Sequence, residues 1–301
     1  REVKDLGGKT VLLRVDFNVE TDQDALKLRE SLPTITHLIS SGAKVVLMSH
    51  RGRPTAPDPN LSLRFALPFL QKSLGKAVQF LPDWDFDQMW QQISAAKAGS
   101  IFLLENLRFN PGEDREDKKF SHSLASLGDI YVNDAFASWR PGASVTVLPK
   151  LLPSYAGFLM EREITHLDKV LRKPKKPLVV VMAGGGKAVD KFDVITHLYG
   201  QSTTFLIGGV LANTFLKARG MNVDSSIVEE SLLCKAQEYL GDSKIELPTD
   251  WVSDEAGKIL DLGSLSAAHY GQIIKRAGTV IWNGPMGIFE DKRYRAGSVT
   301  I

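Results

Sequence analysis

The sequence has little cysteine, no long apolar run and no marked excess of one charge, and each shortage excludes a class of protein. Cys234 is the only cysteine among 301 residues, so an intramolecular disulfide is impossible. The first five residues lack the apolar core of a signal peptide, and no apolar run reaches the roughly 20 residues of a membrane span. A formal net charge of +2 argues against nucleic acid or membrane recognised through bulk charge. We therefore expect a cytoplasmic protein without nucleic-acid or membrane partners.

Short apolar runs alternate with longer helical patterns along the chain. The expected strands are Val11–Val15, Lys44–Met48, Ile101–Leu104, Ile130–Val132, Leu178–Ala183, Thr204–Ile207 and Thr279–Trp282. The expected helices are Ser31–Ser41, Ser62–Leu74, Phe120–Ser126, Glu163–Leu171, Asp190–Leu198 and Ser266–Arg276. The strands are rich in Val, Ile and Leu without polar alternation, as in parallel strands buried on both faces. The pattern predicts an α/β fold with two doubly wound, Rossmann-like parallel sheets.

The join between the two sheets is expected at residues 158–176. Residues 158–171 read as one amphipathic helix, and the basic stretch after it contains Pro174 and ends at Pro177. Proline cannot continue a helix and forces extended backbone before it. We therefore predict a first domain at 1–157, an interdomain helix and linker at 158–176, and a second domain at 177–301.

Polar side chains suited to anions follow the strands of the first half. The loops are Arg14-Val-Asp-Phe-Asn-Val19, Ser49-His-Arg-Gly-Arg-Pro54, Glu105-Asn-Leu-Arg108 and Val132-Asn-Asp-Ala-Phe-Ala-Ser-Trp-Arg140. Ligands of open α/β sheets bind at the carboxyl ends of the strands, and arginine suits bidentate capture of phosphate or carboxylate. The loops predict a site for a small, highly anionic ligand. The alternative is that the arginines pair with nearby acids, for example Arg108 with Glu105.

A glycine-rich turn in the second half follows a strand and opens a helix. It reads Ala183-Gly-Gly-Gly-Lys-Ala-Val-Asp-Lys191, so backbone N–H groups and a helix N-terminus can face a phosphate. Ala188 stands where a Walker A loop has a hydroxyl, and the glycine spacing is not that of GxGxxG. Taken alone, the turn is equally compatible with a tight strand–helix connection.

Five segments together resemble the phosphoglycerate kinase family. They are VLLRVDFNV, VVLMSHRGRP, LLENLRFNPGE, YVNDAF and VIWNGPMGIFE, and the likeness extends over essentially the whole chain. The resemblance implies a transferase that moves a phosphoryl group between ATP and 3-phosphoglycerate in glycolysis or gluconeogenesis. The first domain would bind 3-phosphoglycerate and the second the nucleotide. The resemblance also implies Mg²⁺, a monomer, and hinge closure about the helix at 158–172.

The resemblance assigns roles to individual residues. Substrate binding falls to Asp16, Phe17, Asn18, His50, Arg53, Arg108 and Arg140, and catalysis to Lys187, Lys27 and Arg53. Nucleotide binding falls to Gly185, Gly186, Lys187, Lys191, Gly208, Gly209, Asn283, Pro285, Gly287 and Glu290. Lys187 would steady the transferred phosphoryl group, Glu290 would accept from ribose hydroxyls, and Asp190 would hold Mg²⁺.

The sequence departs from the family pattern at four points. When the chain is aligned with the family on Leu32-Pro-Thr-Ile35, Lys27 occupies the position of the family's catalytic arginine. The sequence Trp139-Arg140 stands where the family has a His-Arg pair. Val210 replaces a glycine beside the nucleotide. Family members also continue beyond residue 301 into a glycine-rich phosphate-binding turn, so we expect a fragment of a longer sequence.

Two alternatives stand beside the kinase, of which the departures favour the first and the Rossmann-like sheet suggests the second. One is a non-catalytic relative or fragment that binds an anionic metabolite without transferring phosphate. The other is a dinucleotide-dependent oxidoreductase, against which the missing GxGxxG fingerprint argues.

Overall fold

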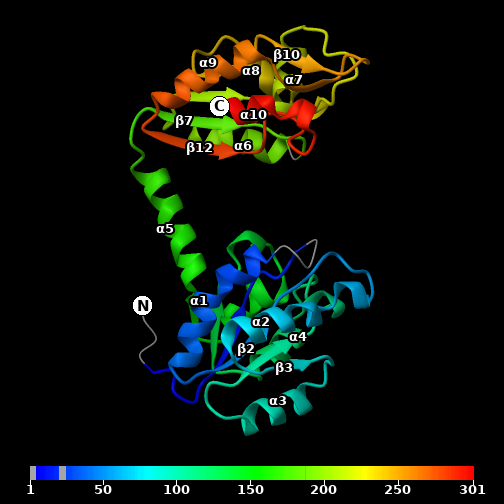
Figure 1. Cartoon of the computed structure of the whole chain (residues 1–301), viewed down its shortest axis with the longest axis vertical. Coiled ribbons are helices and arrows are strands. Elements are labelled where there is room, and N and C mark those ends of the chain that lie inside the picture. The colour runs from blue at the N-terminus through cyan, green and yellow to red at the C-terminus, as the bar shows by residue number, and fades with distance from the viewer. Residues whose placement is uncertain (1–4, 20–24, 187) are drawn as a thin grey trace. The chain divides into compact units, whose positions relative to one another are not determined.

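The computed structural model of the chain describes residues 5–19, 25–186 and 188–301. The chain separates into two compact units, Arg1–Leu167 (unit 1) and Asp168–Ile301 (unit 2). The division lies within helix α5 (Phe158–Arg172), inside the segment predicted to join two domains (Figure 1). The boundaries at residues 157 and 177 stay predictions. None of the helices in the described ranges has the length and apolar character needed to cross a membrane.

Unit 1 is built on a parallel six-stranded sheet in the order β3-β4-β2-β1-β5-β6. Its strands are β1 (Thr10–Arg14), β2 (Lys44–Met48), β3 (Val78–Leu81), β4 (Ile101–Leu104), β5 (Ile130–Asn133) and β6 (Ser154–Ala156). Its helices are α1 (Leu26–Ser40), α2 (Leu67–Leu74), α3 (Phe86–Ala95) and α4 (Lys118–Ala125), followed by the first part of α5.

The sheet of unit 1 is covered on both faces, which explains its continuous apolar strands. Val11 and Leu13 of β1 pack with residues of α1 and α2, whereas Leu12 packs on the opposite face with residues of α3 and α4. All three side chains are fully buried. Each such burial stabilises the fold by about 1.5–3 kcal/mol, so the strands form the centre of a three-layer unit.

Unit 2 repeats this plan with a shorter parallel sheet, β12-β7-β8-β9, and an antiparallel pair, β10-β11. Its strands are β7 (Leu178–Met182), β8 (Thr204–Ile207), β9 (Ile245–Glu246), β10 (Trp251–Ser253), β11 (Ile259–Leu262) and β12 (Thr279–Asn283). Its helices are α6 (Ala188–Leu198), α7 (Gly209–Ala218), α8 (Leu233–Glu238), α9 (Ser264–Lys275) and α10 (Ala296–Thr300). Residues of α6, α7 and α8 cover one face of the sheet, and residues of α9 cover the other.

The predicted α/β class with two parallel sheets is confirmed, and some element bounds are corrected. The helix predicted from Ser31 begins at Leu26, and the one predicted from Ser62 begins at Leu67 after two 3₁₀ turns. Strands β3, β6, β9, β10 and β11 and helices α3, α7 and α10 are not among the predicted elements. These strands are short, and several carry exposed polar residues, so they lack the apolar run that marks a buried strand.

Strand order fixes where ligands can bind in each unit. The chain leaves β1 toward β2 on one side and leaves the neighbouring β5 toward β6 on the other side. In unit 2 it runs from β7 through β8 to β9 before it returns to β12 on the other side of β7. At such a switch point the loops after neighbouring strands separate and leave a crevice at the carboxyl edge. The loops after β1, β2, β4 and β5, and those after β7, β8 and β12, are therefore the natural site elements.

Candidate active site

Unit 1 has a cavity of about 610 Å³ at the carboxyl edge of its sheet, which we call the basic cavity. It is lined by Asn18, Val19, Lys27, His50, Gly52, Arg53, Arg108, Ala137, Ser138 and Arg140. These residues come from the loops after β1, β2, β4 and β5 and from the start of α1. Six residues predicted to contact substrate or to act in catalysis thus lie around one cavity.

Two further predicted substrate residues support the basic cavity without lining it. Asp16 is buried, and its Oδ2 lies 3.1 Å from the Lys27 ammonium, which also donates to the Asn18 carbonyl at 2.8 Å. Phe17 is fully buried in the hydrophobic core, and its backbone N–H donates to Ser49 Oγ at 2.9 Å. The Asp16 carboxylate therefore positions the Lys27 ammonium, and the buried ring of Phe17 anchors the loop after β1.

The loop after β2 is held against its neighbours by backbone contacts at Gly52. Asn18 Oδ1 accepts from the Gly52 N–H at 2.8 Å, and the Gly52 carbonyl accepts from Arg108 Nη1 at 2.8 Å. Gly52 has φ +64, a conformation that glycine adopts without strain. These bonds tie the loops that carry Asn18 and Arg108 to the loop after β2.

The suggested pairing of Arg108 with Glu105 is wrong. Arg108 Nε instead lies 3.0 Å from Asp114, which is largely exposed, while the carboxylate of Glu105 accepts from Ser62 and Leu63. Such an exposed pair contributes about 0–1 kcal/mol and leaves the guanidinium available to a ligand. Arg51, the other arginine of the β2 loop, is buried, with its guanidinium 4.1 Å from the ring centre of Phe65.

His50 is the most strongly perturbed titratable group of the basic cavity. Its Nδ1 lies 2.7 Å from Arg14 Nη2. Burial, with the charges of Arg14, Arg108, Lys27 and Arg140, lowers the pKa of His50 from 6.5 to about 2. The imidazole is therefore neutral at every pH at which the protein is expected to work.

The depressed pKa of His50 predicts a loss of stability in acid. The unfolded chain binds a proton here below pH 6.5, whereas the folded chain does so only near pH 2, so the free energy of unfolding falls as the pH drops below 6.5. This group should contribute roughly 1 kcal/mol per pH unit. His50→Gln keeps an acceptor for Arg14 and does not titrate, so its decline should be shallower. Urea unfolding between about pH 6.5 and 4.5 measures both slopes, and equal slopes would contradict the prediction.

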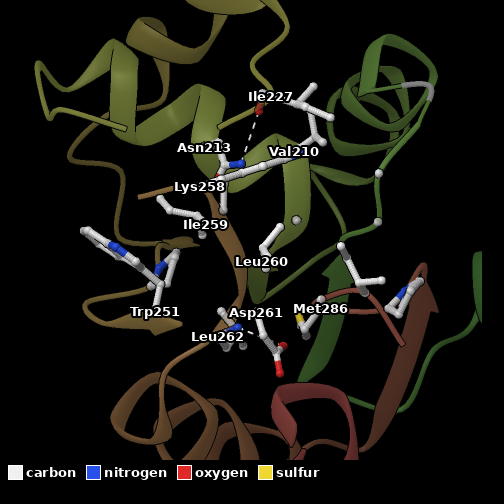
Figure 2. A pocket seen from close by; sticks show the side chains of 18 of the residues that line it. Val210, Asn213, Ile227, Trp251, Lys258, Ile259, Leu260, Asp261, Leu262 and Met286 are labelled. Atoms are coloured by element: carbon white, nitrogen blue, oxygen red, sulfur yellow. Dashed lines mark hydrogen bonds between the residues drawn. The ribbon is translucent and has the colours of Figure 1, made fainter. Parts of the chain in front are cut away.

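Unit 2 has a cavity of about 430 Å³, which we call the apolar cavity because aliphatic and aromatic side chains form most of its wall (Figure 2). Val210, Leu260 and Met286 are among them. Five predicted nucleotide residues line it, namely Gly185, Gly209, Pro285, Gly287 and Glu290. An apolar cavity of this kind suits a nucleobase, which gains from apolar and stacking contacts.

Other predicted nucleotide residues lie next to the apolar cavity. Lys191 donates to the Gly186 carbonyl at 2.8 Å, and burial lowers the pKa of its ammonium. A Cβ on Gly208 would lie 2.3 Å from Met286 Sδ, so only glycine permits this packing. Asn283 ends β12, and its carbonyl accepts from Ala183. Lys187 lies outside the described residues.

Several residues that line the apolar cavity have no role assigned from the sequence, among them Asn213, Trp251 and Lys258. Asn213 lies on α7 and donates to the Ile227 carbonyl at 3.2 Å, while Trp251 and Lys258 come from the β10–β11 segment (Figure 2). The Lys258 side chain makes no hydrogen bond or ion pair within the described ranges. Its position depends on the turn of residues 254–257, which sequence spacing does not reveal.

Comparisons with known proteins give a consistent result. The family model described as "Phosphoglycerate kinase" matches residues 1–301. The chain is 38% identical over 327 residues to the phosphoglycerate kinase of Aquifex aeolicus, covering 99% of this chain and 82% of that protein. It is 39% identical over 323 residues to a phosphoglycerate kinase of Thermus thermophilus, covering 98% of this chain and 82% of that protein.

Solved structures agree with the sequence comparison. The phosphoglycerate kinase of Coxiella burnetii superposes with a TM-score of 0.83 at 30% identity, covering 98% of this chain and 82% of that one. The enzyme of Pyrococcus horikoshii OT3 gives a TM-score of 0.84 at 28% identity, with 98% and 83% covered.

Proposed function

Because the chain belongs to the phosphoglycerate kinase family, we propose that its basic cavity binds 3-phosphoglycerate and its apolar cavity binds the base of the nucleotide. The activity of the family is ATP-dependent phosphoryl transfer to 3-phosphoglycerate in glycolysis, with ATP and ADP as co-substrates, and the chain is a kinase of this class. Nothing in the comparisons favours a non-catalytic relative or an oxidoreductase.

One observation carries the assignment of the basic cavity. Cationic side chains from three strand-end loops and the start of α1 meet there: Arg53, Arg108, Arg140 and Lys27. The ligand that matches them carries a phosphate and a carboxylate on a short carbon chain, because guanidinium groups bind both oxyanions in bidentate fashion. The neutral His50 and the amide of Asn18 add uncharged hydrogen-bonding groups to the same wall.

The chemistry follows from the charges of the reactants. A carboxylate oxygen of 3-phosphoglycerate forms a bond to the γ-phosphorus of ATP, and the bond from that phosphorus to the β–γ bridging oxygen breaks, with its electron pair leaving on ADP. The attacking carboxylate is already ionised, so no general base is needed. Catalysis then consists of positioning and charge neutralisation. We assign the neutralising role to Lys27 and Arg53 of unit 1 and to Lys187 of unit 2.

The nucleotide is proposed to lie along the loops after β7, β8 and β12. Glu290 would accept hydrogen bonds from the ribose, and Lys191 would contact phosphate. Asp190 is an exposed carboxylate in the first turn of α6, and no cluster of three metal-ligating side chains occurs in the described ranges. A single carboxylate fits Mg²⁺ that arrives with nucleotide phosphates, and the ion would supply neutralisation of the phosphate charge.

The proposal extends to the setting of the protein. We propose a monomer that works in the cytoplasm, where the substrates of glycolysis are found. Light scattering tests the first point, since a monomer has a mass of 33.2 kDa. A mass of twice that value would contradict it.

The direct test of the function is ATP consumption by the purified chain in the presence of Mg²⁺. We expect turnover that depends on 3-phosphoglycerate and stops when the metal is chelated. Calorimetric titration with each substrate separately shows which unit fails if turnover is absent. Binding of neither substrate would overturn the proposal.

Replacement of Arg108 by methionine tests the basic cavity. The change removes a guanidinium that lines the cavity and leaves a side chain of similar length. A lost charge-assisted hydrogen bond costs about 1.5–3 kcal/mol, so the KM for 3-phosphoglycerate should rise roughly 10- to 100-fold while the KM for ATP stays unchanged. Arg115→Met is the control, because Arg115 is exposed on the same segment and does not line the cavity. Equal effects of the two changes would indicate a general charge effect.

A further inference from the structure

A buried chain of polar groups ends at His50 behind the basic cavity. Arg14, the last residue of β1, is 2% exposed and does not line the cavity. Its Nη1 donates to the Val15 carbonyl at 2.6 Å, its Nε to Ser144 Oγ at 3.0 Å, and its Nη2 lies 2.7 Å from His50 Nδ1. Each nitrogen of the guanidinium thus has a partner, which fixes the position of the group.

The chemistry of arginine sets the direction of the contact with His50. A guanidinium has only donors, so His50 Nδ1 must accept and carries no hydrogen. In a neutral imidazole the hydrogen then resides on Nε2. Since His50 lines the basic cavity while its Nδ1 is engaged with Arg14, Nε2–H is the group that can reach a ligand.

Ser144 and Glu113 hold Arg14 in this position. Ser144 Oγ donates its single hydrogen to Glu113 Oε1 at 2.6 Å and therefore accepts from Arg14 Nε. The Ser144 backbone N–H donates to the other carboxylate oxygen of Glu113 at 3.0 Å. Glu113 is 3% exposed and Ser144 is fully buried, so the carboxylate compensates a guanidinium that would otherwise be an unpaired buried charge.

We propose that Glu113, Ser144 and Arg14 are positioning residues that lock His50 in its Nε2–H tautomer and so present a neutral hydrogen-bond donor to the anionic substrate. The proposal rests on the proposed binding of 3-phosphoglycerate in the basic cavity. The opposite tautomer would aim a lone pair at phosphate or carboxylate oxygens, which already carry negative charge. The lock therefore converts a histidine that could repel the substrate into one that attracts it.

The charges around His50 support this role. Arg14 approaches from β1, Lys27 from α1, Arg108 from the loop after β4 and Arg140 from the loop after β5, and each of these charges adds to burial in lowering the pKa of His50. A second proton on the ring would lie against Arg14. The donor consequently stays neutral across the pH range of glycolysis, and substrate affinity should not titrate with this histidine.

Long-range ¹H–¹⁵N correlation spectra of the ¹⁵N-histidine-labelled full chain test the tautomer directly. The chain has six histidines, so the His50 signals are assigned by their loss in His50→Gln. We expect the Nε2–H pattern at every pH between about 5 and 8, with and without 3-phosphoglycerate. An Nδ1–H or doubly protonated pattern would overturn the inference. Because wild-type protein is used, the result does not depend on the folding of a variant.

A serine variant tests whether the buried chain controls His50. Ser144→Ala cuts the link between Glu113 and Arg14, so we expect a mixture of tautomers in the spectrum and a KM for 3-phosphoglycerate raised about 3- to 10-fold, with the KM for ATP unchanged. Ser126→Ala is the control, since Ser126 is exposed at the end of α4. An unchanged tautomer in Ser144→Ala would show that the chain does not position His50. Failure of wild-type protein to bind 3-phosphoglycerate would instead count against the proposed function, whatever the tautomer.

Discussion

Replacing Lys27 by methionine should lower kcat about a thousandfold while the chain still binds 3-phosphoglycerate. Cations that neutralise charge on a transferring phosphoryl group contribute about 10³–10⁵ in kcat. The Lys27 ammonium lies on the wall of the basic cavity, where it donates to the Asn18 carbonyl and forms an ion pair with Asp16. An ammonium has three N–H groups, so Lys27 keeps donors that can face a ligand. Methionine keeps much of the aliphatic stem and removes the charge.

Two further variants show whether the effect belongs to this position. Lys27→Arg introduces the planar guanidinium that the family is expected to have at this position. We expect a kcat equal to or several-fold above that of the parent chain. Arg29→Met removes the other nearby cation of α1. Because residues two apart on a helix point roughly 200° apart, this change should leave kcat unaffected. Initial rates at saturating substrates measure all three. A larger loss in Arg29→Met than in Lys27→Met would reverse the assignment.

The residues of the basic cavity could be predicted because chemistry and position agree in the sequence. His50, Arg53 and Arg108 each follow an apolar run that reads as a buried strand, and parallel strands bring such loops to one edge. Phe17 shows the limit of this reasoning. It lies between two polar residues of such a loop, yet its ring is buried in the core. Sequence order gives the loop, but the side-chain direction depends on packing.

Contacts between distant segments could not be read from the sequence. Ser144 lies 130 residues from Arg14, and nothing in its neighbourhood marks it as a partner of a buried guanidinium. Lys258 reaches the apolar cavity only because the chain reverses between β10 and β11. The two glycines at residues 208 and 209 are typical of a loop that lines a ligand, whereas in the structure Gly209 is the first residue of helix α7. Propensity is local, whereas these features are set by tertiary contacts.

Replacing Gly209 by alanine should destabilise unit 2 by about 3 kcal/mol, since left-handed strain costs about 1–2 kcal/mol and overpacking about 1–3 kcal/mol. Gly209 begins α7 with φ +56, and a Cβ there would lie 2.6 Å from the Gly184 backbone nitrogen and 2.7 Å from its carbonyl oxygen. Backbone cannot rotate aside as a side chain can, so one of the two turns must move. Both glycines line the apolar cavity, and we therefore expect the affinity for ATP to fall at least tenfold as well.

Gly220 provides a matched control just beyond the other end of the same helix. It has φ +86, but an added Cβ would meet nothing within 4 Å. Gly220→Ala should therefore cost only the backbone strain, about 1 kcal/mol, and leave ATP binding unchanged. Hydrogen exchange followed by mass spectrometry reports the stability of each unit separately, and calorimetry gives the affinity. If the two variants behave alike, the strain at positive φ is the whole effect. A larger loss in Gly209→Ala would show that the close approach of the two turns holds the nucleotide cavity in shape.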